Sequence, residues 1–323
     1  MRAARIHGWN TVPVIEDVPE PVRRPGQTLV RVDAATVSHL DLTVRTGAFA
    51  LTPPLPYVPG CEGAGTVVES EAFAPGTQVI VSGGALGLDR DGTWRERIVL
   101  PDGMLMAIKT PLPPSIAAAF FTPTTTAAVT LFDIGGLESG QTVLITGATG
   151  AVGALAVQLA RAAGAHVVAV VSRASRLAAL PTDVVGVAMD DVEATARLAA
   201  ERPADLLVDT IGGPGLGERI GWVRFGGRAA CLGYSAGTRA TLDLPNWFFS
   251  SVAILPVNLM AYGKQARTHA RRLLPRFADG SLTIPVEEFP LVYAADAIMR
   301  LEGGRLSGRA VLRFPSPDNR STA

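Results

Sequence analysis

Cysteine is scarce in this chain of 323 residues, and the two that occur, Cys61 and Cys231, lie far apart in the sequence. Two scattered cysteines provide neither a disulfide framework nor a cysteine-rich zinc site. Lysine is equally rare, because Lys109 and Lys264 are the only two and arginine carries nearly all of the positive charge. The absence of a disulfide pattern favours a cytoplasmic protein.

Net charge and long apolar runs are missing as well. The formal net charge is +0, so electrostatic binding to nucleic acid or to an anionic membrane is not expected. The first residues lead directly into polar sequence, which predicts no signal peptide. Gln158 and Arg161 interrupt the most apolar stretch, and no run reaches the roughly 20 apolar residues of a membrane span. No nucleic-acid partner and no membrane association are therefore expected.

The stretch from Thr142 to Ser172 predicts a strand, a glycine turn, a helix and a second strand. About 30 residues is the length of one βαβ unit. Both strand segments are runs of aliphatic and β-branched residues, which is typical of a parallel sheet covered on both faces. From Thr142 to about residue 257 strands and helices alternate, and this favours a doubly wound parallel sheet in an α/β fold.

Glycines at the start of the predicted helix indicate a dinucleotide site. The pattern Ala148-x-Gly150-x-x-Gly153 differs from the usual Gly-x-Gly-x-x-Gly only in its first residue. Gly150 would let the backbone approach a bound group, Gly153 would let the helix pack on the strand, and the helix N-terminus suits a pyrophosphate. The alternative is a plain βαβ unit with a tight turn and no ligand. The predicted contacts come from Thr149, Gly150, Ala151, Val152 and Gly153.

The end of the second strand bears on the choice of dinucleotide. NAD-binding units usually place an acid there for the ribose hydroxyl, whereas this chain has Ser172, followed by Arg173 and Arg176. A hydroxyl and two guanidinium groups would bind a 2′-phosphate through charge-assisted bonds. We therefore predict NADPH as the cofactor. The alternative is that both arginines are solvated residues at a helix start.

The remaining segments suggest that the dinucleotide domain is inserted in another domain. Residues 1–115 contain short strands punctuated by glycine and proline, residues 116–257 hold the α/β pattern, and residues 258–323 close the chain. The closing strand 308–314 is expected to join the N-terminal β region. Four other expected elements are a helix at 217–223, a strand at 253–257, a helix at 266–278 and a strand at 290–293.

Three further motifs accompany the glycine turn in the order of a known family. The segment Pro59-Gly-Cys-Glu-Gly-Ala-Gly-Thr-Val67, then Asp209-Thr-Ile-Gly-Gly213, then Gly226-Gly-Arg228 resembles medium-chain dehydrogenases/reductases. The match is best to the zinc-free branch and, within it, to quinone oxidoreductases. The resemblance implies a GroES-like β-rich catalytic domain, an inserted Rossmann domain and a cleft between them.

The same resemblance implies that no metal is used. Zinc-dependent relatives carry Cys, His and Cys where this chain has Ser38, Cys61 and, nearby, Thr122. A catalytic zinc ion needs three protein ligands with nitrogen, sulfur or carboxylate donors. An unusual site from His39, Asp41, Cys61 and Glu62 is the alternative that these residues leave open.

Familiar acid groups of the family are also replaced. Quinone oxidoreductases usually have Asn at Ser38 and Tyr near Thr43, while Phe49 and Leu40 stand where related enzymes carry hydroxyl donors. Hydride transfer needs no side-chain acid when the cofactor positions the substrate. By alignment, the implied catalytic residues are Ser38, Thr43 and Tyr57, and further cofactor contacts are Thr126, Gly233, Tyr234 and Arg309.

Each of these residues also has a purely structural interpretation. Ser38 could be only a helix cap, Thr126 could bond its own helix, Tyr57 and Tyr234 could be packing residues, and Arg309 could lie on the surface. The resemblance implies NADPH-dependent, zinc-independent reduction of a small-molecule substrate, a quinone or an activated enone or carbonyl compound. The alternatives are a tailoring reductase of a biosynthetic pathway and a non-catalytic NADPH-binding protein. By resemblance, the chain would form a homodimer through 253–257.

Overall fold

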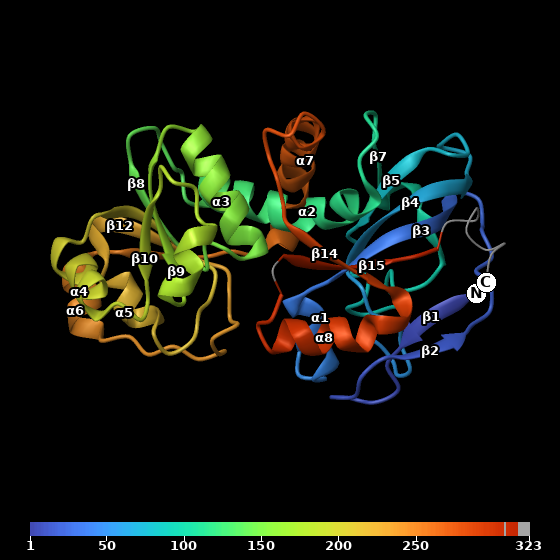
Figure 1. Cartoon of the computed structure of the whole chain (residues 1–323), viewed down its shortest axis with the longest axis horizontal. Helices are drawn as coiled ribbons and strands as arrows, with labels where there is room; N and C mark the ends of the chain where they lie inside the picture. The colour runs from blue at the N-terminus through green and yellow to red at the C-terminus, as the bar shows by residue number, and fades with distance from the viewer. Residues whose placement is uncertain (307, 316–323) are drawn as a thin grey trace. The chain divides into compact units, whose positions relative to one another are not determined.

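The structure, a computed structural model, describes residues 1–306 and 308–315 of the chain (Figure 1). The chain divides into two compact units, residues 1–122 with 275–323 (unit 1) and residues 123–274 (unit 2). Unit 2 is thus inserted in unit 1, and the predicted insertion of an α/β domain in a β-rich one is confirmed.

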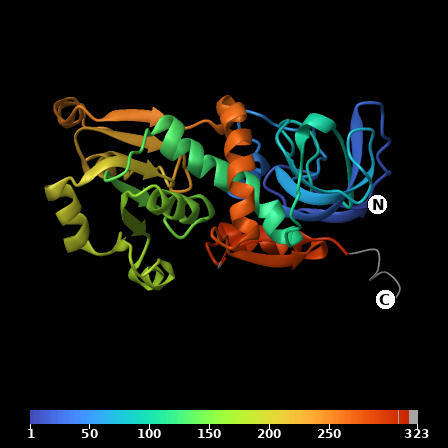
Figure 2. The same ribbon diagram turned by 90° about the horizontal axis from the view of Figure 1, so that it is seen from above.

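Unit 1 is built on a seven-stranded sheet in the order β14-β15-β3-β4-β5-β7, with β6 also paired to β3. The closing strand β15 runs antiparallel to β3, so both ends of the chain contribute to one sheet (Figures 1 and 2). Its strands are β3 (Gln27–Val37), β4 (Glu62–Glu69), β5 (Gln78–Ser82), β6 (Arg97–Pro101), β7 (Leu105–Ala107), β14 (Val286–Pro290) and β15 (Arg309–Arg313), and β1 (Arg2–Arg5) pairs separately with β2 (Val14–Asp17).

Short helices complete unit 1. They are α1 (His39–Arg45), η1 (Asp102–Met104), η5 (Leu291–Tyr293) and α8 (Ala294–Glu302). Helix α8 buries Ala294, Ala297 and Ile298, whose spacing of three and four residues puts them on one face. Arg45 of α1 donates to both carboxylate oxygens of Glu302 at 3.0 Å, which ties the two helices together.

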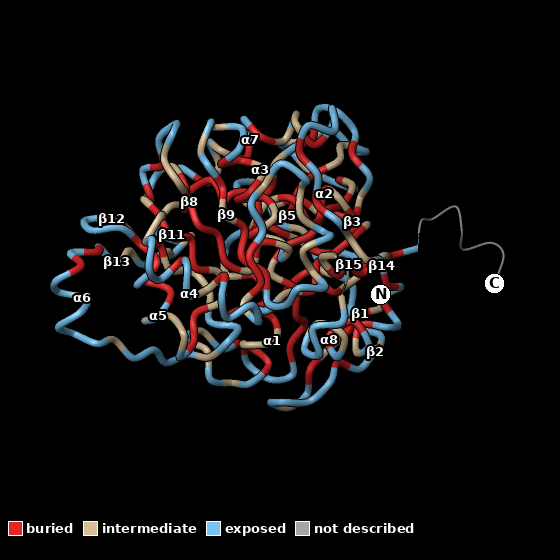
Figure 3. The backbone as a smooth tube through the Cα atoms, turned by 60° about the vertical axis from the view of Figure 1, so that its left-hand side comes forward, coloured by how far each residue is buried: buried red, intermediate tan, exposed pale blue. Residues whose placement is uncertain are grey.

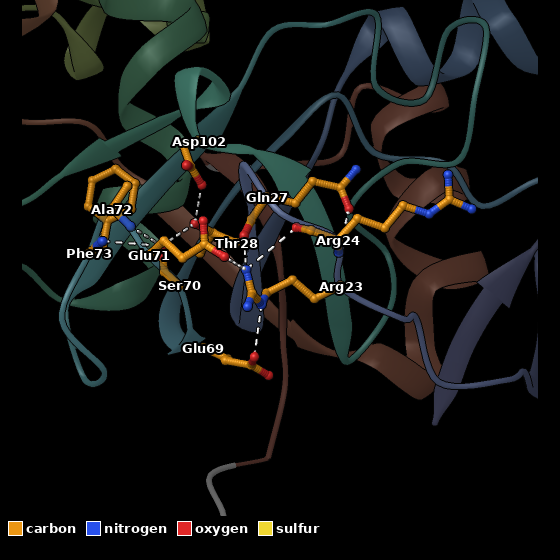
Figure 4. A network of polar contacts seen from close by, with 10 residues as sticks. All are labelled: Arg23, Arg24, Gln27, Thr28, Glu69, Ser70, Glu71, Ala72, Phe73 and Asp102. Atoms are coloured by element: carbon orange, nitrogen blue, oxygen red, sulfur yellow. Dashed lines mark hydrogen bonds and ion pairs between the residues drawn. The ribbon is translucent and has the colours of Figure 1, made fainter.

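A polar network fastens the loop after β4 to strand β3 (Figure 4). The buried hydroxyl of Thr28 donates to Asp102 at 2.6 Å and lies 2.7 Å from the hydroxyl of Ser70. Arg23 forms ion pairs with Glu69 and Glu71 at 2.9 and 3.2 Å. The network therefore satisfies a buried hydroxyl that would otherwise destabilise the sheet.

Unit 2 contains a six-stranded parallel sheet in the order β10-β9-β8-β11-β12-β13. Numbered from its first strand this order is 3-2-1-4-5-6, the doubly wound order of dinucleotide-binding domains. The aliphatic runs of β8 and β9 are almost wholly buried, as Figure 3 shows in red. The strands are β8 (Thr142–Thr146), β9 (His166–Val171), β10 (Val185–Ala188), β11 (Ala204–Asp209), β12 (Val223–Cys231) and β13 (Ala253–Pro256).

Five helices of unit 2 lie between these strands in the sequence, as the alternating pattern predicts. They are α3 (Ala151–Ala162), η3 (Ala174–Ala179), α4 (Val192–Glu201), α5 (Leu216–Ile220) and α6 (Leu244–Ser250), and η4 (Leu259–Tyr262) follows the last strand. Helix α3 packs Leu155, Val157 and Leu159 into the core, whereas helix α4 exposes most of its residues.

Two helices run through the unit boundaries. The first boundary, between residues 122 and 123, falls within α2 (Pro114–Ala128), which continues as the π-helix η2 (Val129–Ile134). The second boundary, between residues 274 and 275, falls within α7 (Gly263–Ala278). The sequence placed the divisions after residues 115 and 257, at changes of composition. Helical residues continue across the observed boundaries, although Pro123 and Pro275 lie inside the two helices.

Two predicted elements are wrong in part. The expected helix 217–223 ends at Ile220, because Trp222 and Val223 are buried and β12 begins at Val223. The expected strand 290–293 is the 3-10 turn η5, and the strand lies before it, in β14. The β-branched and aromatic residues of 290–293 suggested a strand, but β14 ends at Pro290.

The segment Pro114–Ile134 is long and apolar enough to cross a bilayer by length and composition, with a mean hydropathy of 1.3 over its best window. However, 78% of that window is buried inside the protein, as in the core helix of a globular domain. It is the only such helix among the residues that the structure describes.

Candidate functional site

The turn between β8 and α3 has the geometry that the glycine pattern predicts. Gly147 has a φ of 58°, and the N–H of Gly150 donates to its carbonyl at 2.8 Å. A Cβ atom on Gly153 would lie 2.2 Å from that same carbonyl oxygen, so no larger residue fits. The turn therefore brings backbone against backbone at the start of α3, where free N–H groups can bind phosphate.

The loops after β11 and β12 pack against each other at the same ends of their strands. A Cβ atom on Gly233 would lie 1.7 Å from the carbonyl oxygen of Thr210, and one on Gly212 would lie 2.2 Å from that of Gly233. Thr210 also binds the end of β8, because its N–H donates to Thr146 Oγ1 at 2.9 Å and its hydroxyl to Thr146 O at 2.7 Å. Strands β8 and β11 are neighbours at the switch point of the sheet, where doubly wound folds bind ligands.

A buried ion pair holds the loop after β11. Arg219 of α5 and Asp209 are 3% and 0% exposed, and Nε of Arg219 donates to Asp209 Oδ2 at 2.5 Å. Asp209 Oδ1 accepts from the N–H of Gly212 at 2.6 Å, and Arg219 Nη2 donates to Gly212 O at 2.6 Å. Both oxygens of the Asp209 carboxylate thus hold the loop, Oδ1 directly at Gly212 and Oδ2 through Arg219. The motif Asp209 to Gly213 was noted in the sequence, but Arg219 was not.

The loop after β9 contains the residues predicted to select the cofactor. Ser172 and Arg173 are exposed and Arg176 is half-buried in η3. Asp190 also reaches this loop, because its Oδ1 accepts from the N–H of Ala174 at 3.0 Å. Sequence reasoning missed this acid, since it follows β10 and only the pairing of β9 with β10 brings it here.

The other predicted contacts in unit 2 occupy varied positions. Thr149, Ala151 and Val152 are half-buried around the glycine turn, and Thr126 is buried in α2. Tyr234 is 38% exposed on the loop that follows Gly233, so the packing interpretation of this side chain is wrong.

Ser38, at the end of β3, is the N-cap of α1 and is bound to a buried carboxylate. Both its N–H and its hydroxyl donate to Asp41 Oδ2, at 2.8 and 2.6 Å. Asp41 is 2% exposed, and its Oδ1 accepts from the N–H of Gly60 at 3.0 Å and the thiol of Cys61 at 3.6 Å. Burial raises the pKa of Asp41 above its ordinary value, although the hydrogen bonds from Ser38 and Gly60 oppose that rise.

Thr43 and Tyr57 have different surroundings. The hydroxyl of Thr43 donates to the carbonyl of His39 at 2.9 Å within α1. Tyr57 is 1% exposed in a cluster with Ile6, Val44 and Leu88, and its hydroxyl has no hydrogen-bond partner among the described residues. Burial raises the pKa of Tyr57, and the nearby carboxylate of Asp41 adds to this effect.

Arg309 is bound within unit 1 and does not lie on the surface. Its guanidinium forms an ion pair with the buried carboxylate of Glu62 and donates to Thr36 Oγ1 at 3.3 Å. Glu62 Oε2 also accepts from the N–H of Thr122 in α2 at 2.8 Å. The surface interpretation of Arg309 is therefore wrong. Contact between Arg309 and a cofactor stays a prediction.

Within the described part of the chain, no group of three or more His, Cys, Asp or Glu side chains could hold a metal ion. Cys61 is a free cysteine, and burial together with Asp41 and Glu62 raises its pKa well above the ordinary value. The glycine turn fits a dinucleotide, because Gly150 carries no side chain at the start of α3, where a pyrophosphate would approach the backbone.

Comparison with known proteins agrees with this geometry. A family model described as "Alcohol dehydrogenase GroES-like domain" matches residues 24–110, and one described as "Zinc-binding dehydrogenase" matches residues 151–276. The human synaptic vesicle membrane protein VAT-1 homolog is 35% identical over 126 residues, which cover 39% of this chain and 31% of the relative. The matched segment thus spans about a third of that relative's length.

Other relatives match over more of the chain. The putative quinone oxidoreductase YhfP of Bacillus subtilis is 27% identical over 88% of this chain and 90% of the relative. The acrylyl-CoA reductase AcuI of Ruegeria pomeroyi is 29% identical over 76% and 78% of the two chains.

Solved structures share the whole fold. An NAD-dependent alcohol dehydrogenase superposes with a TM-score of 0.87 at 28% identity, covering 98% of this chain and 100% of the other. The quinone oxidoreductase of Thermus thermophilus, whose structure was solved alone and with NADPH, has a TM-score of 0.82 at 28% identity and covers 97% and 100%.

Proposed function

Because this chain belongs to the medium-chain dehydrogenase/reductase superfamily and is quinone oxidoreductase-like, we propose that it is an NADPH-dependent, zinc-independent reductase. Its substrate would be a quinone or an activated enone or carbonyl compound. The observation that carries the proposal is the glycine turn of β8–α3, located at the switch point of a parallel sheet.

The chain's own residues would bind and orient the cofactor, which supplies the hydride when bound. The N–H groups at the start of α3 would hold the pyrophosphate beside Gly150 and Gly153. Ser172, Arg173 and Arg176 would bind the 2′-phosphate with charge-assisted bonds. Zinc independence is supported by Ser38, since a hydroxyl is not a usual zinc ligand, and by the described residues, among which no group of three or more His, Cys, Asp or Glu side chains could hold a metal ion.

Cofactor titration of the purified protein tests the proposal. We expect the wild type to bind NADPH more tightly than NADH, and Arg176→Ala to lose about 10- to 150-fold of NADPH affinity, the value of one charge-assisted bond. Asp190→Asn should strengthen NADPH binding, because it removes a negative charge near the expected phosphate. Arg197→Ala, an exposed position on α4, is the matched control. Equal affinity of the wild type for both nucleotides would contradict the NADPH assignment.

An enoyl reductase of a biosynthetic pathway is the second candidate. The similarity to an acrylyl-CoA reductase over most of the chain favours it. A panel of quinones, enones, enoyl thioesters and ketones, followed by the absorbance of NADPH, separates the two. Turnover of quinones alone would exclude the biosynthetic role.

We also propose a homodimer that pairs the two copies of β13. This strand lies at one edge of the parallel sheet, and the adjacent helix α6 is largely exposed (Figure 3). Its Phe249 side chain is 85% exposed. Light scattering should give about twice the chain mass of 33.7 kDa. Ala253→Glu on β13 should shift the protein to the monomer, whereas Val185→Glu on the opposite edge strand should not. A wild-type monomer would contradict the proposal.

A further inference from the structure

The loops after β8, β9 and β10 lie along one edge of the parallel sheet of unit 2. The strand order β10-β9-β8 makes the three strands neighbours, and they run parallel, so their carboxyl ends lie at the same edge. Segment η3 packs over β10, because a Cβ atom on Gly186 would lie 2.9 Å from the side chains of Leu177 and Leu180. The glycine turn, the loop of Ser172 and the loop after β10 therefore follow one another along this edge.

The adenosine half of a dinucleotide has its parts in the same order. The pyrophosphate binds at the helix N-terminus after the first strand, and the ribose binds at the end of the second strand. The base is attached to that ribose at the end opposite the pyrophosphate. The next position along the edge, the end of β10, is therefore the one that the base would reach. All of these positions lie within unit 2.

Asp190, two residues after the end of β10, has a free acceptor at this position. Its Oδ1 accepts from the N–H of Ala174 at 3.0 Å, which satisfies the first N–H of η3 and holds the side chain in place. Within the described part of the chain, Oδ2 makes no hydrogen bond or ion pair, and the residue is exposed. A helix cap needs only one carboxylate oxygen, so the second is available to a ligand.

An ionised carboxylate can only accept hydrogen bonds, and this property distinguishes one purine from another. Adenine has an amino group at its 6-position, which donates, whereas guanine and hypoxanthine have a carbonyl oxygen there, which can only accept. A bound base also needs apolar contact. Val192, the first residue of α4, lies two residues beyond Asp190 and is 78% exposed, so it offers an apolar surface beside the carboxylate.

We propose that Asp190 selects adenine in the bound nucleotide, with Oδ2 accepting from the 6-amino group while Oδ1 keeps its bond to Ala174. This inference rests on the nucleotide binding proposed above, and it gives a role to an acid that lies near the expected 2′-phosphate. The carboxylate repels that phosphate and thus lowers the affinity for NADPH. In return it makes the site selective for the base.

Calorimetric titration with NADPH and with its hypoxanthine analogue measures this selection and requires no turnover. We expect the wild type to bind NADPH about tenfold or more tightly than the analogue, the value of one hydrogen bond to a charged group. In Asp190→Asn the amide oxygen can keep the bond to Ala174, and the amide N–H then replaces Oδ2 and donates to the carbonyl oxygen of hypoxanthine. The preference for NADPH should therefore fall about tenfold or more.

The ratio of the two affinities isolates the contact with the base. Both nucleotides carry the same 2′-phosphate, so removing its repulsion from Asp190 changes both affinities by the same factor. NADH and its own hypoxanthine analogue, which lack that phosphate, should show the same ratio in each protein. Glu193→Gln, which removes an exposed acid three residues away on α4, is the matched control and should keep the wild-type ratio.

Three results would overturn the inference. A wild-type ratio near one, or an unchanged ratio in Asp190→Asn, would show that this residue does not select the base, while the reductase proposal stands. Equal losses of affinity for NADH and its analogue in Asp190→Asn would place the carboxylate on the ribose instead. If no nicotinamide nucleotide binds at all, the reductase proposal itself fails and the inference fails with it.

Discussion

Arg219→Met is expected to destabilise unit 2 by about 3–5 kcal/mol, the usual loss when one partner of a buried ion pair is removed. The substitution leaves the carboxylate of Asp209, which is 0% exposed, without its cation. It also leaves the carbonyl of Gly212 without the guanidinium N–H that now donates to it. Methionine has a similar volume, so the loss would come from electrostatics and hydrogen bonding.

Urea denaturation followed by tryptophan fluorescence, to which the buried Trp222 contributes, would measure this loss, and amide hydrogen exchange of β11 and α5 would locate it. Arg224→Met is the matched control, because Arg224 pairs with Asp205 at 2.5 Å but is 52% exposed. Exposed pairs contribute about 0–1 kcal/mol. Equal losses in the two variants would show that burial of the Arg219 pair does not matter.

The sequence predicted those parts of the fold that depend on local pattern. The aliphatic runs of β8 and β9 are typical of covered parallel strands, and the spacing of Gly150 and Gly153 favours a close strand–helix turn. The closing strand 308–314 was correctly assigned to the N-terminal β region, since β15 (Arg309–Arg313) pairs with β3.

The sequence could not reveal partners that come together only through the sheet or the burial pattern. Asp190 reaches the loop after β9 because β10 pairs with β9, a contact that no spacing rule contains. Arg219 looks like a surface residue of a short helix until Asp209 is known to be buried. The same holds for Asp41, whose position three residues after Ser38 indicates a cap but not its burial against Gly60 and Cys61.

Gly153→Ala and Gly150→Ala should separate the structural role of the glycine turn from its role in binding. A methyl group on Gly153 would lie 2.2 Å from Gly147 O and 2.8 Å from the carbonyl carbon of that residue, and both are backbone atoms. The turn must shift, so we expect a loss of stability of about 3 kcal/mol, at the upper end for overpacking. Hydrogen exchange should increase in β8 and α3.

The same change at Gly150 meets only one atom, Gly147 O, at 3.2 Å. Gly150 is the N-cap of α3, a position that favours glycine over alanine, so stability should fall by about 1 kcal/mol, less than for Gly153→Ala. Its methyl group would instead occupy the space where the pyrophosphate approaches the backbone, and nicotinamide nucleotide affinity should fall about tenfold or more. Calorimetric titration and urea unfolding of both variants measure the two effects. A nucleotide that lies against this turn would meet the new methyl group of Gly150→Ala. If the variant binds the nucleotide as tightly as the wild type does, the nucleotide lies elsewhere.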